Sequence, residues 1–451
     1  MRTGEPLMAN QTREVSWTDW ARLQLFLTIP VFLLGLVAPN RVFLWLFVQC
    51  GVGERSAHFL RNLSDKYGCD QLWVRFPLRR TLLVMAPATM DAVLASDANA
   101  PDPFLKKRAL SRFVPDGLIV SSTVEARDRR GFNTHALDLD TGKPHRHSEA
   151  FVAIAITEAA RLTADRSAGL RWMDFQSLGE RISHQVILGM GQSEPELAAH
   201  LARMIPFSNL LLRYVPSYSA FYARIDQLLA GQRTASSASC LMHDAAMSLS
   251  DGSATEATKV PSQIGFWFFV LKDAIELHVA RTLALIAAHP EVQARVREEI
   301  LAAEPLTTTS IDGLRYLEAC IAEQLRLWTP VPLLLRRAAK AFLLGGDLPI
   351  EPEQQLLIHA GFYHRDPRVF GDRADTFSPE ARGAGFPKVY SFSDHDRGCA
   401  GKSLVMFVLK ATLASLLGAA RFELAGPTIQ PGRIAYLYDH FGIELKPIRA
   451  A

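Results

Sequence analysis

One cysteine in this sequence is placed where its sulfur could do chemistry. It lies in the segment FSDHDRGCAG (residues 392–401), directly before an apolar helical stretch over residues 403–417. At a helix N-terminus the unpaired N–H groups and the positive end of the dipole favour a thiolate over a thiol, and Arg397 adds a positive charge. Gly401 has no Cβ and admits the close approach of a flat ligand. The pattern indicates that Cys399 binds a metal macrocycle, and it leaves open a structural cysteine that merely precedes a helix.

A second feature is the pair Glu323 and Arg326, on a helix expected over residues 311–328. Residues three apart share a helix face and can pair, although Glu158 and Arg161 have the same spacing, so the spacing alone is weak evidence. The sequence has no G-x-S-x-G, H-E-x-x-H or P-loop motif. These absences disfavour a serine hydrolase, a zinc protease and a nucleotide-binding enzyme.

The elements that must position these residues are mostly helices. The longest is predicted over residues 264–288, which has no proline, no glycine after Gly265, and Pro290 to end it. Residues 74–87 read as two short strands around a turn, and the chain beyond Pro330 predicts a second small sheet. Residues 234–258, rich in Ser, Thr and Gly, predict a flexible loop. We expect a mainly α protein with small β-sheets (α+β), in one large domain.

The first part of the chain is unusually apolar. Residues 23–38 carry no charge, and a second apolar run covers residues 42–48. A bilayer core requires about 20 apolar residues, or somewhat fewer with thinning. We therefore expect an N-terminal segment over residues 1–52 with a membrane anchor at about 22–48, followed by a catalytic domain over residues 53–451. A buried core helix would explain the same length.

Composition excludes several classes of protein. With 49% hydrophobic and 21% charged residues in 451, the chain is an ordinary globular protein. A formal charge of +3, from 49 Lys and Arg against 46 Asp and Glu, is too small for a nucleic-acid footprint, so no nucleic-acid partner is expected. Five widely separated cysteines encode neither a disulfide framework nor a zinc knuckle, which fits a reducing compartment.

Taken in order, these segments resemble the cytochrome P450 family of haem-thiolate monooxygenases. The cysteine segment is similar to the family pattern F-x-x-G-x-R-x-C-x-G at Phe392, Arg397, Cys399 and Gly401, and Glu323 with Arg326 matches its E-x-x-R helix. His364 to Pro367 and Ala288 to Glu291 look like further family segments, and the resemblance covers roughly residues 55–445. It implies the family fold, with the long central helix over haem b (iron protoporphyrin IX).

The resemblance also implies roles for individual residues. Cys399 would be the axial thiolate of the iron. Arg397, Arg337 and Arg130 match positions that bind the haem propionates, which need paired cations when buried. Arg382 would complete a structural cluster with Glu323 and Arg326.

The sequence departs from the family at four places. His395 replaces a glycine of the cysteine loop, where a positive φ would be costly for a side chain. The acid–alcohol pair of the central helix falls on Asp273 and Ala274, so the acid is kept and the alcohol, which takes part in proton delivery, is lost. Ala126 replaces a propionate-binding tryptophan. Val270 and Leu271 replace small residues beside the haem, while Lys272 and Glu276 are possible companions of Asp273.

The activity implied is the insertion of one atom of O2 into an apolar small molecule, such as a lipid or terpenoid, with electrons from a ferredoxin or reductase. The loss at Ala274 raises an alternative, a haem-thiolate isomerase, dehydratase or peroxygenase acting on a peroxide without a redox partner. A haem-binding protein without turnover is a third. The anchor implies membrane association with the catalytic domain on the cytoplasmic side. An acidic electron donor would dock on the cations Lys388, Arg397, Lys402 and Lys410.

Overall fold

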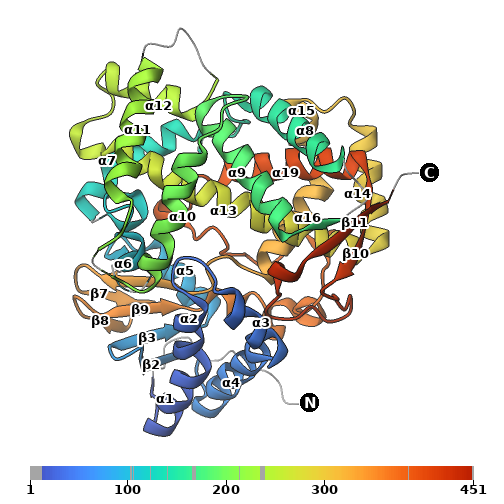
Figure 1. The fold of residues 1–451 in the computed structure, drawn as a ribbon. Coiled ribbons are helices and arrows are strands. Elements are labelled where there is room, and N and C mark those ends of the chain that lie inside the picture. Colours follow the sequence, from blue (N-terminus) through green and yellow to red (C-terminus); the bar gives the residue numbers. More distant parts are fainter. Residues whose placement is uncertain are drawn as a thin grey trace.

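Helices dominate this computed structural model, which describes residues 13–101, 104, 106–121, 123–139, 141–164, 169–212, 214–233, 239–383 and 385–448 (Figure 1). The small sheets lie beside the helical part, so the prediction of a mainly α protein with small β-sheets is confirmed.

The central helix is α13 (Val260–Ala287), which crosses the middle of the molecule (Figure 1). It begins four residues earlier than predicted, because Pro261 fits the first turn, where no N–H partner is needed. Around it pack α9 (Trp172–Leu188), α16 (Arg315–Leu327) and α19 (Lys402–Ala419). The other helices of eight or more residues in the main body are α4 (Val52–Tyr67), α5 (Pro87–Ala95), α7 (Thr123–Ala136), α8 (Ser148–Ala164), α10 (Pro195–Asn209), α11 (Tyr218–Arg233), α12 (Leu241–Ser250) and α14 (Pro290–Ala302).

The main sheet has the strand order β1-β2-β3-β9-β6-β4. Its strands are β1 (Arg13–Glu14), β2 (Gln71–Arg75), β3 (Arg80–Val84), β4 (Asn99–Pro101), β6 (Leu334–Ala338) and β9 (Gln355–Ile358). The two strands predicted within residues 74–87 are present as β2 and β3. The second small sheet predicted beyond Pro330 is present only as the pair β7 (Phe342–Leu344) and β8 (Leu348–Ile350), because β9 pairs in parallel with β3 and brings β6 and β9 into the main sheet.

Two smaller sheets complete the β structure of the described residues. One contains β10 (Arg421–Gly426), β11 (Glu444–Ile448) and β5 (Leu170–Arg171), and the other contains β7 (Phe342–Leu344) and β8 (Leu348–Ile350). Two local predictions were also wrong. Residues 241–250 of the expected loop form α12 because Leu241, Met242, Ala245 and Ala246 are buried at helical spacing, while residues 234–238 lie outside the described part. The helix expected over 311–328 is divided at Leu314 into α15 (Thr308–Gly313) and α16.

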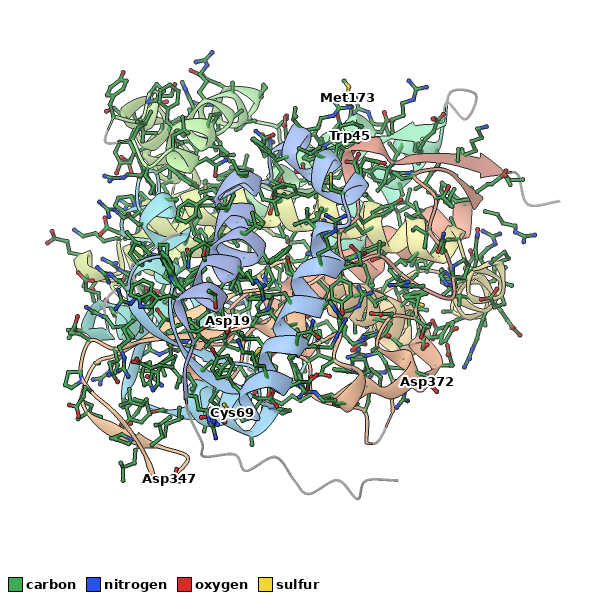
Figure 2. All side chains as sticks on the ribbon, turned by 90° about the horizontal axis from the view of Figure 1, so that it is seen from below. Asp19, Trp45, Cys69, Met173, Asp347 and Asp372 are labelled. Atoms are coloured by element: carbon green, nitrogen blue, oxygen red, sulfur yellow. The ribbon has the colours of Figure 1, made fainter. Side chains whose placement is uncertain are left out.

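The N-terminal apolar run begins in a continuous helical stretch, which consists of α1 (Trp17–Leu23), the π-helical turn η1 (Gln24–Thr28) and α2 (Ile29–Leu34). Gly35, with φ +100°, ends this stretch before α3 (Arg41–Gln49). Leu23, Leu27 and Leu44 are buried against the domain, and Figure 2 shows these helices laid across one face of the molecule. The first twelve residues of the predicted segment lie outside the described residues. By length and composition the one described helix that could cross a membrane is α19, and 67% of that stretch is buried in the protein.

Candidate active site

The cysteine loop folds back on itself just before α19. The Cys399 N–H donates to the Phe392 carbonyl over 2.8 Å, and the Gly398 N–H donates to the His395 carbonyl over 2.9 Å. His395 takes φ +52° and Ser393 takes φ +58°. The left-handed conformation that we expected at His395 is therefore present in a residue with a side chain, and the loop hydrogen bonds must hold it there.

The Cys399 thiol is exposed and yet desolvated. Burial raises its pKa, against the opposing effects of the Gly401 N–H, Arg130 and Lys402. A group that is both open and surrounded by protein lies beside an internal space rather than at the outer surface. The Gly401 N–H at the start of α19 favours the thiolate, as predicted, and the cations that act on the sulfur are Arg130 and Lys402, but in the chain alone burial outweighs these effects on the pKa of Cys399. Coordination to a metal ion would deprotonate the thiol in any case.

One face of α13 is also open to the interior. Most residues of this helix are buried, but a set at intervals of three and four is only half-buried, and we call it the inner face: Phe266, Val270, Ala274, Leu277 and Arg281. Asp273, next to Ala274, is half-buried as well. Apart from Arg281 the face is apolar, so it can line a space for an apolar ligand.

The two expected companions of Asp273 point elsewhere. Lys272 Nζ lies 2.6 Å from Glu276 Oε2, and both residues pack where Gly179 of α9 crosses α13. Burial raises the pKa of Glu276 to about 7, against the effect of Lys272. The pair therefore belongs to the α9–α13 contact rather than to a solvated face, and the charge of Asp273 also raises the pKa of Glu276.

The arginine at the cysteine loop is Arg336 rather than Arg337. Arg336 is buried, donates to Ser393 Oγ over 2.9 Å, and has its pKa lowered to about 10 by burial and by the charge of Arg397. Arg337, predicted to bind a propionate, instead lies 2.7 Å from Glu353. Successive residues of strand β6 point to opposite faces, so a shift of one position reverses the side. Arg130 of α7, the other predicted cation, donates to the Gly398 carbonyl.

The predicted cluster of Glu323, Arg326 and Arg382 is assembled in the core. Arg326 Nη2 lies 2.6 Å from Glu323 Oε1, and Arg382 Nη1 lies 3.2 Å from Glu323 Oε2. Arg326 also donates to the backbone carbonyls of His364, Arg373, Ala374 and Thr376. The cluster therefore ties α16 to the irregular chain that leads to the cysteine loop.

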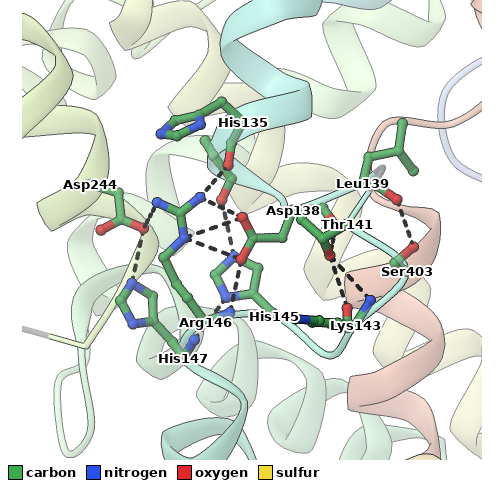
Figure 3. A network of polar contacts seen from close by, with 11 residues as sticks. His135, Asp138, Leu139, Thr141, Lys143, His145, Arg146, His147, Asp244 and Ser403 are labelled. Atoms are coloured by element: carbon green, nitrogen blue, oxygen red, sulfur yellow. Dashed lines mark hydrogen bonds and ion pairs between the residues drawn. The ribbon is translucent and has the colours of Figure 1, made fainter.

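A polar network that the sequence did not reveal braces the chain between α7 and α8 (Figure 3). Arg146 pairs with Asp138, and His147 Nε2 lies 2.9 Å from Asp244 Oδ2 on α12. Ser403, in the first turn of α19, donates to the Leu139 carbonyl over 3.4 Å. The network thus connects the cysteine helix to α7, which carries Arg130.

The cationic docking surface is largely absent among the described residues. Lys410 is buried and donates to the Asp312 carbonyl and to Glu318. Lys388 is held between Asp91, at 2.8 Å, and Asp394. Of the predicted lysines, Lys402 alone remains exposed with no acidic partner, because the others are paired or buried.

The residues present fit a haem. Cys399 supplies one soft ligand for the iron. The buried Arg336, beside Arg397, carries a positive charge that no carboxylate of the described chain neutralises. The two haem propionates would neutralise it. A Cβ built on Gly401 would meet Leu137 Cδ1 at 3.8 Å and nothing closer. No protein contact therefore requires glycine there, which is consistent with room kept for a flat group.

Comparison with known proteins agrees with this geometry. Residues 278–433 match the family profile described as Cytochrome P450. The chain is 29% identical over 184 residues to cytochrome P450 4c3 of Drosophila melanogaster (38% of this chain, 34% of the relative). It is 30% identical over 169 residues to cytochrome P450 CYP72A616 of Paris polyphylla (35% and 32%) and 32% identical over 185 residues to cytochrome P450 714C2 of Oryza sativa subsp. japonica (37% and 35%). The matches thus span about a third of the length of these curated relatives. Together with the cysteine loop and the Glu323 cluster, they show that residues 278–433 of this chain form a region of the cytochrome P450 family.

Proposed function

We propose that this chain binds haem b through Cys399 and inserts one atom of O2 into an apolar small molecule, using electrons from a ferredoxin or reductase. The observation that carries the proposal is the exposed but desolvated thiol of Cys399 at the first turn of α19, in a molecule whose central helix also presents a half-buried apolar face. The bound haem supplies the activation of dioxygen, which side chains alone do not provide.

The chain's own residues hold the haem and shape its surroundings. Cys399 is the ligand, and Arg130, Arg336 and Arg397 are the cations for the propionates. Val270 and Leu277 of the inner face exclude water and contact the substrate. Asp273 holds a proton near Ala274, where the family's alcohol is absent, so proton delivery relies on this acid and on water.

The N-terminal helices support association with a membrane surface rather than a crossing. Their inner sides are buried on the domain, and their outer sides expose large apolar residues: Leu25, Ile29, Phe32, Leu33, Val42, Trp45 and Leu46. Asn209 at the end of α10 bonds to the backbone of Val37 and Ala38, so the exposed Leu210 and Leu212 adjoin them. Helices with an outward apolar face lie in the membrane interface. We propose such an attachment, with the domain on the cytoplasmic side.

The test is the absorption spectrum of the purified, haem-loaded protein after reduction and addition of CO, which reports thiolate ligation. We expect a thiolate spectrum in the wild type and in Cys50→Ala, an exposed cysteine far along the chain from the loop, and its loss in Cys399→Ala. With a reductase and NADPH, the wild type should consume reducing equivalents when an apolar substrate is present. A thiolate spectrum that survives Cys399→Ala would refute the ligand assignment. Turnover of hydroperoxides with no electron donor, and none with one, would refute the monooxygenase.

A further inference from the structure

The tip of the cysteine loop (residues 393–395) is a strained piece of backbone. Ser393 has φ +58° and His395 has φ +52°, so two of the seven described residues other than glycine with a positive φ flank one position, Asp394. The backbone of Asp394 itself is extended. A side chain makes the left-handed conformation costly, and contacts at the tip must offset that cost. The partners of Asp394 are therefore informative.

Lys388 joins the tip to a neighbouring helix. Its Nζ pairs with the Asp394 carboxylate and lies 2.8 Å from Asp91 Oδ1 on α5. The ammonium also lies 5.5 Å from the centre of the buried Tyr390 ring. Burial opposes the ionisation of Asp394, but hydrogen bonds, chiefly from Lys388, outweigh it and lower the pKa of that carboxyl. One lysine thus bridges two carboxylates that are far apart in the chain.

The other parts of this bridge rest on the core. The Lys388 carbonyl accepts from the hydroxyl of the buried Tyr363 over 3.0 Å. Helix α5 packs through Met90 and Val93 into the same hydrophobic cluster as Tyr363. The backbone of Lys388 and the helix that carries Asp91 are therefore both fixed, and the loop tip is the part that would move if the bridge were broken.

The tip in turn holds the backbone of the cysteine. The His395 carbonyl accepts from the Gly398 N–H over 2.9 Å, and the Phe392 carbonyl accepts from the Cys399 N–H over 2.8 Å. These two hydrogen bonds close the loop on either side of the tip. A shift of residues 393–395 would break the first bond and turn the peptide that precedes Cys399, and the direction of the sulfur would change with it.

We infer that Lys388 is a positioning residue for the axial ligand: by bridging Asp91 and Asp394 it holds the cysteine loop closed and keeps the Cys399 sulfur directed at the haem iron. This inference rests on the proposed function, because it concerns the loop that carries the ligand. The ion pairs of Lys388 are half-exposed, so they add little to the stability of the whole fold. The local opening of one strained loop is more sensitive to them.

The experiment follows thiolate ligation in the haem-loaded protein, reduced with dithionite and bound to CO, so that docking of an electron donor plays no part. At a urea concentration well below the unfolding midpoint, Lys388→Met should lose the thiolate spectrum at least about fivefold faster than the wild type. Lys388→Arg should restore the slow loss, because a guanidinium can also pair with both carboxylates. The matched control is Lys340→Met, which breaks an exposed pair with Asp97 at 3.2 Å and should behave as the wild type.

A second measurement separates positioning from general stability. The urea midpoint of global unfolding should be the same for Lys388→Met and the wild type, whereas amide hydrogen exchange of residues 392–399 should be faster in the variant. Asp394→Asn should have the same effects, and combining it with Lys388→Met should add nothing further, because both substitutions remove one interaction.

Equal rates of loss for the wild type, Lys388→Met and Asp394→Asn would overturn the inference, and so would an equal acceleration by Lys340→Met. Asp394→Asn gives the same answer should Lys388→Met fail to fold. A wild type without a thiolate spectrum would be a failure of the proposed function, and hydrogen exchange would still show whether Lys388 closes the loop. A normal spectrum that none of these substitutions affects would be a failure of this inference alone.

Discussion

Arg326 satisfies several buried polar groups of the core at once. It is fully buried and satisfies both Glu323 and four backbone carbonyls. Arg326→Met would leave the Glu323 carboxylate with Arg382 as its one cation in the described chain and the carbonyls unpaired. We expect a loss of about 3–5 kcal/mol in the free energy of unfolding. Urea denaturation of the haem-loaded protein measures it.

A suitable comparison for Arg326 is Arg295→Met. Arg295 is exposed and lies over the Tyr316 ring at 4.0 Å, so we expect its replacement to cost less than about 1 kcal/mol. Equal effects of the two substitutions would contradict the view that the buried cluster holds the core together.

Asp273 is the acid that remains beside Ala274. If it holds the proton for the reaction, Asp273→Asn should lower turnover at least about a hundredfold while substrate affinity and the thiolate spectrum stay unchanged. Steady-state kinetics with a reductase, together with the coupling of NADPH consumption to product, measures the effect. Asp226→Asn, a carboxyl on α11 outside the inner face, is the control, and unchanged turnover in Asp273→Asn would remove this role.

For single residues, the sequence predicts which residues take part in the site better than it predicts which way their side chains point. The types and spacing of Cys399, Glu323 and Arg326 predicted their surroundings, because a loop before a helix and a single helix turn place these side chains through local structure. Arg336 and Arg337 differ by one position, and only the pairing of β6 with β9 decides which of them faces the cysteine loop. Arg281 carried no signal in the sequence, since its hydrogen-bond partner His440 is distant in the chain.

The crossing of α9 and α13 is a close helix–helix contact. A Cβ on Gly179 would lie 2.9 Å from the Lys272 carbonyl oxygen and 3.0 Å from the Glu276 nitrogen, both backbone atoms that cannot swing away. Gly179→Ala should therefore destabilise the protein by about 1–3 kcal/mol despite the higher helix propensity of alanine. Thermal unfolding measures it. Gly131→Ala on α7, where a Cβ meets nothing within 4 Å, should instead stabilise by about 0.5–1 kcal/mol, and a stabilising Gly179→Ala would refute the tight crossing.

The first helix is attached to the domain through Asp19. This buried carboxylate accepts from Lys66 Nζ at 2.6 Å and from the Tyr67 hydroxyl at 2.7 Å. Burial opposes ionisation, but these hydrogen bonds and one from Ser16 outweigh it and lower the pKa of Asp19. Because the pKa of Asp19 is lower in the folded than in the unfolded protein, the stabilisation by its ionised carboxylate is complete above the pKa of the unfolded chain, about 4. It is lost as the pH falls through the lower pKa of the folded protein.

Asp19→Asn tests this attachment. We expect it to reduce the free energy of unfolding by about 1–3 kcal/mol at pH 7, and the difference from the wild type should shrink as the pH is lowered below about 4. Urea denaturation at several pH values follows it. Glu14→Gln, which breaks the exposed contact with Arg80, should change stability by less than about 1 kcal/mol at every pH. A difference for Asp19→Asn that grows in acid would contradict a lowered pKa of Asp19 in the folded protein.

Long elements were predicted well from periodicity, and interrupted ones were not. The apolar pattern of α13 predicts a helix and little else, because few other structures accommodate so long an apolar segment. The apolar run at residues 23–38 is compatible with a membrane anchor or with a buried helix, and neither its end at Gly35 nor the burial of Leu23 and Leu27 could be read from the pattern. Pairing of β3 with β9 joins residues more than two hundred positions apart, which no local pattern encodes.

At the scale of the whole molecule, the N-terminal helices give one face a composition unlike the rest. Their outer residues Ile29, Trp45 and Val42 are 47%, 52% and 68% exposed, and on a soluble surface such a contiguous apolar group is unfavourable. The inner sides of the same helices are buried in the core. The proposed attachment in the membrane interface would keep these contacts and cover the outer apolar residues.

The attachment is tested by flotation of the purified protein with phosphatidylcholine vesicles. The wild type should float with the vesicles, and the triple substitution Leu25→Glu, Ile29→Glu and Trp45→Glu should leave the protein in the dense fraction, because three carboxylates in the interface cancel the gain from burying apolar area. The matched control places glutamates at Leu78, Val124 and Leu343, which are at least as exposed but lie outside the N-terminal helices, and it should float normally. Loss of flotation in both variants would show that exposed apolar residues anywhere on the molecule suffice, and no loss in either would mean that these helices do not carry the attachment.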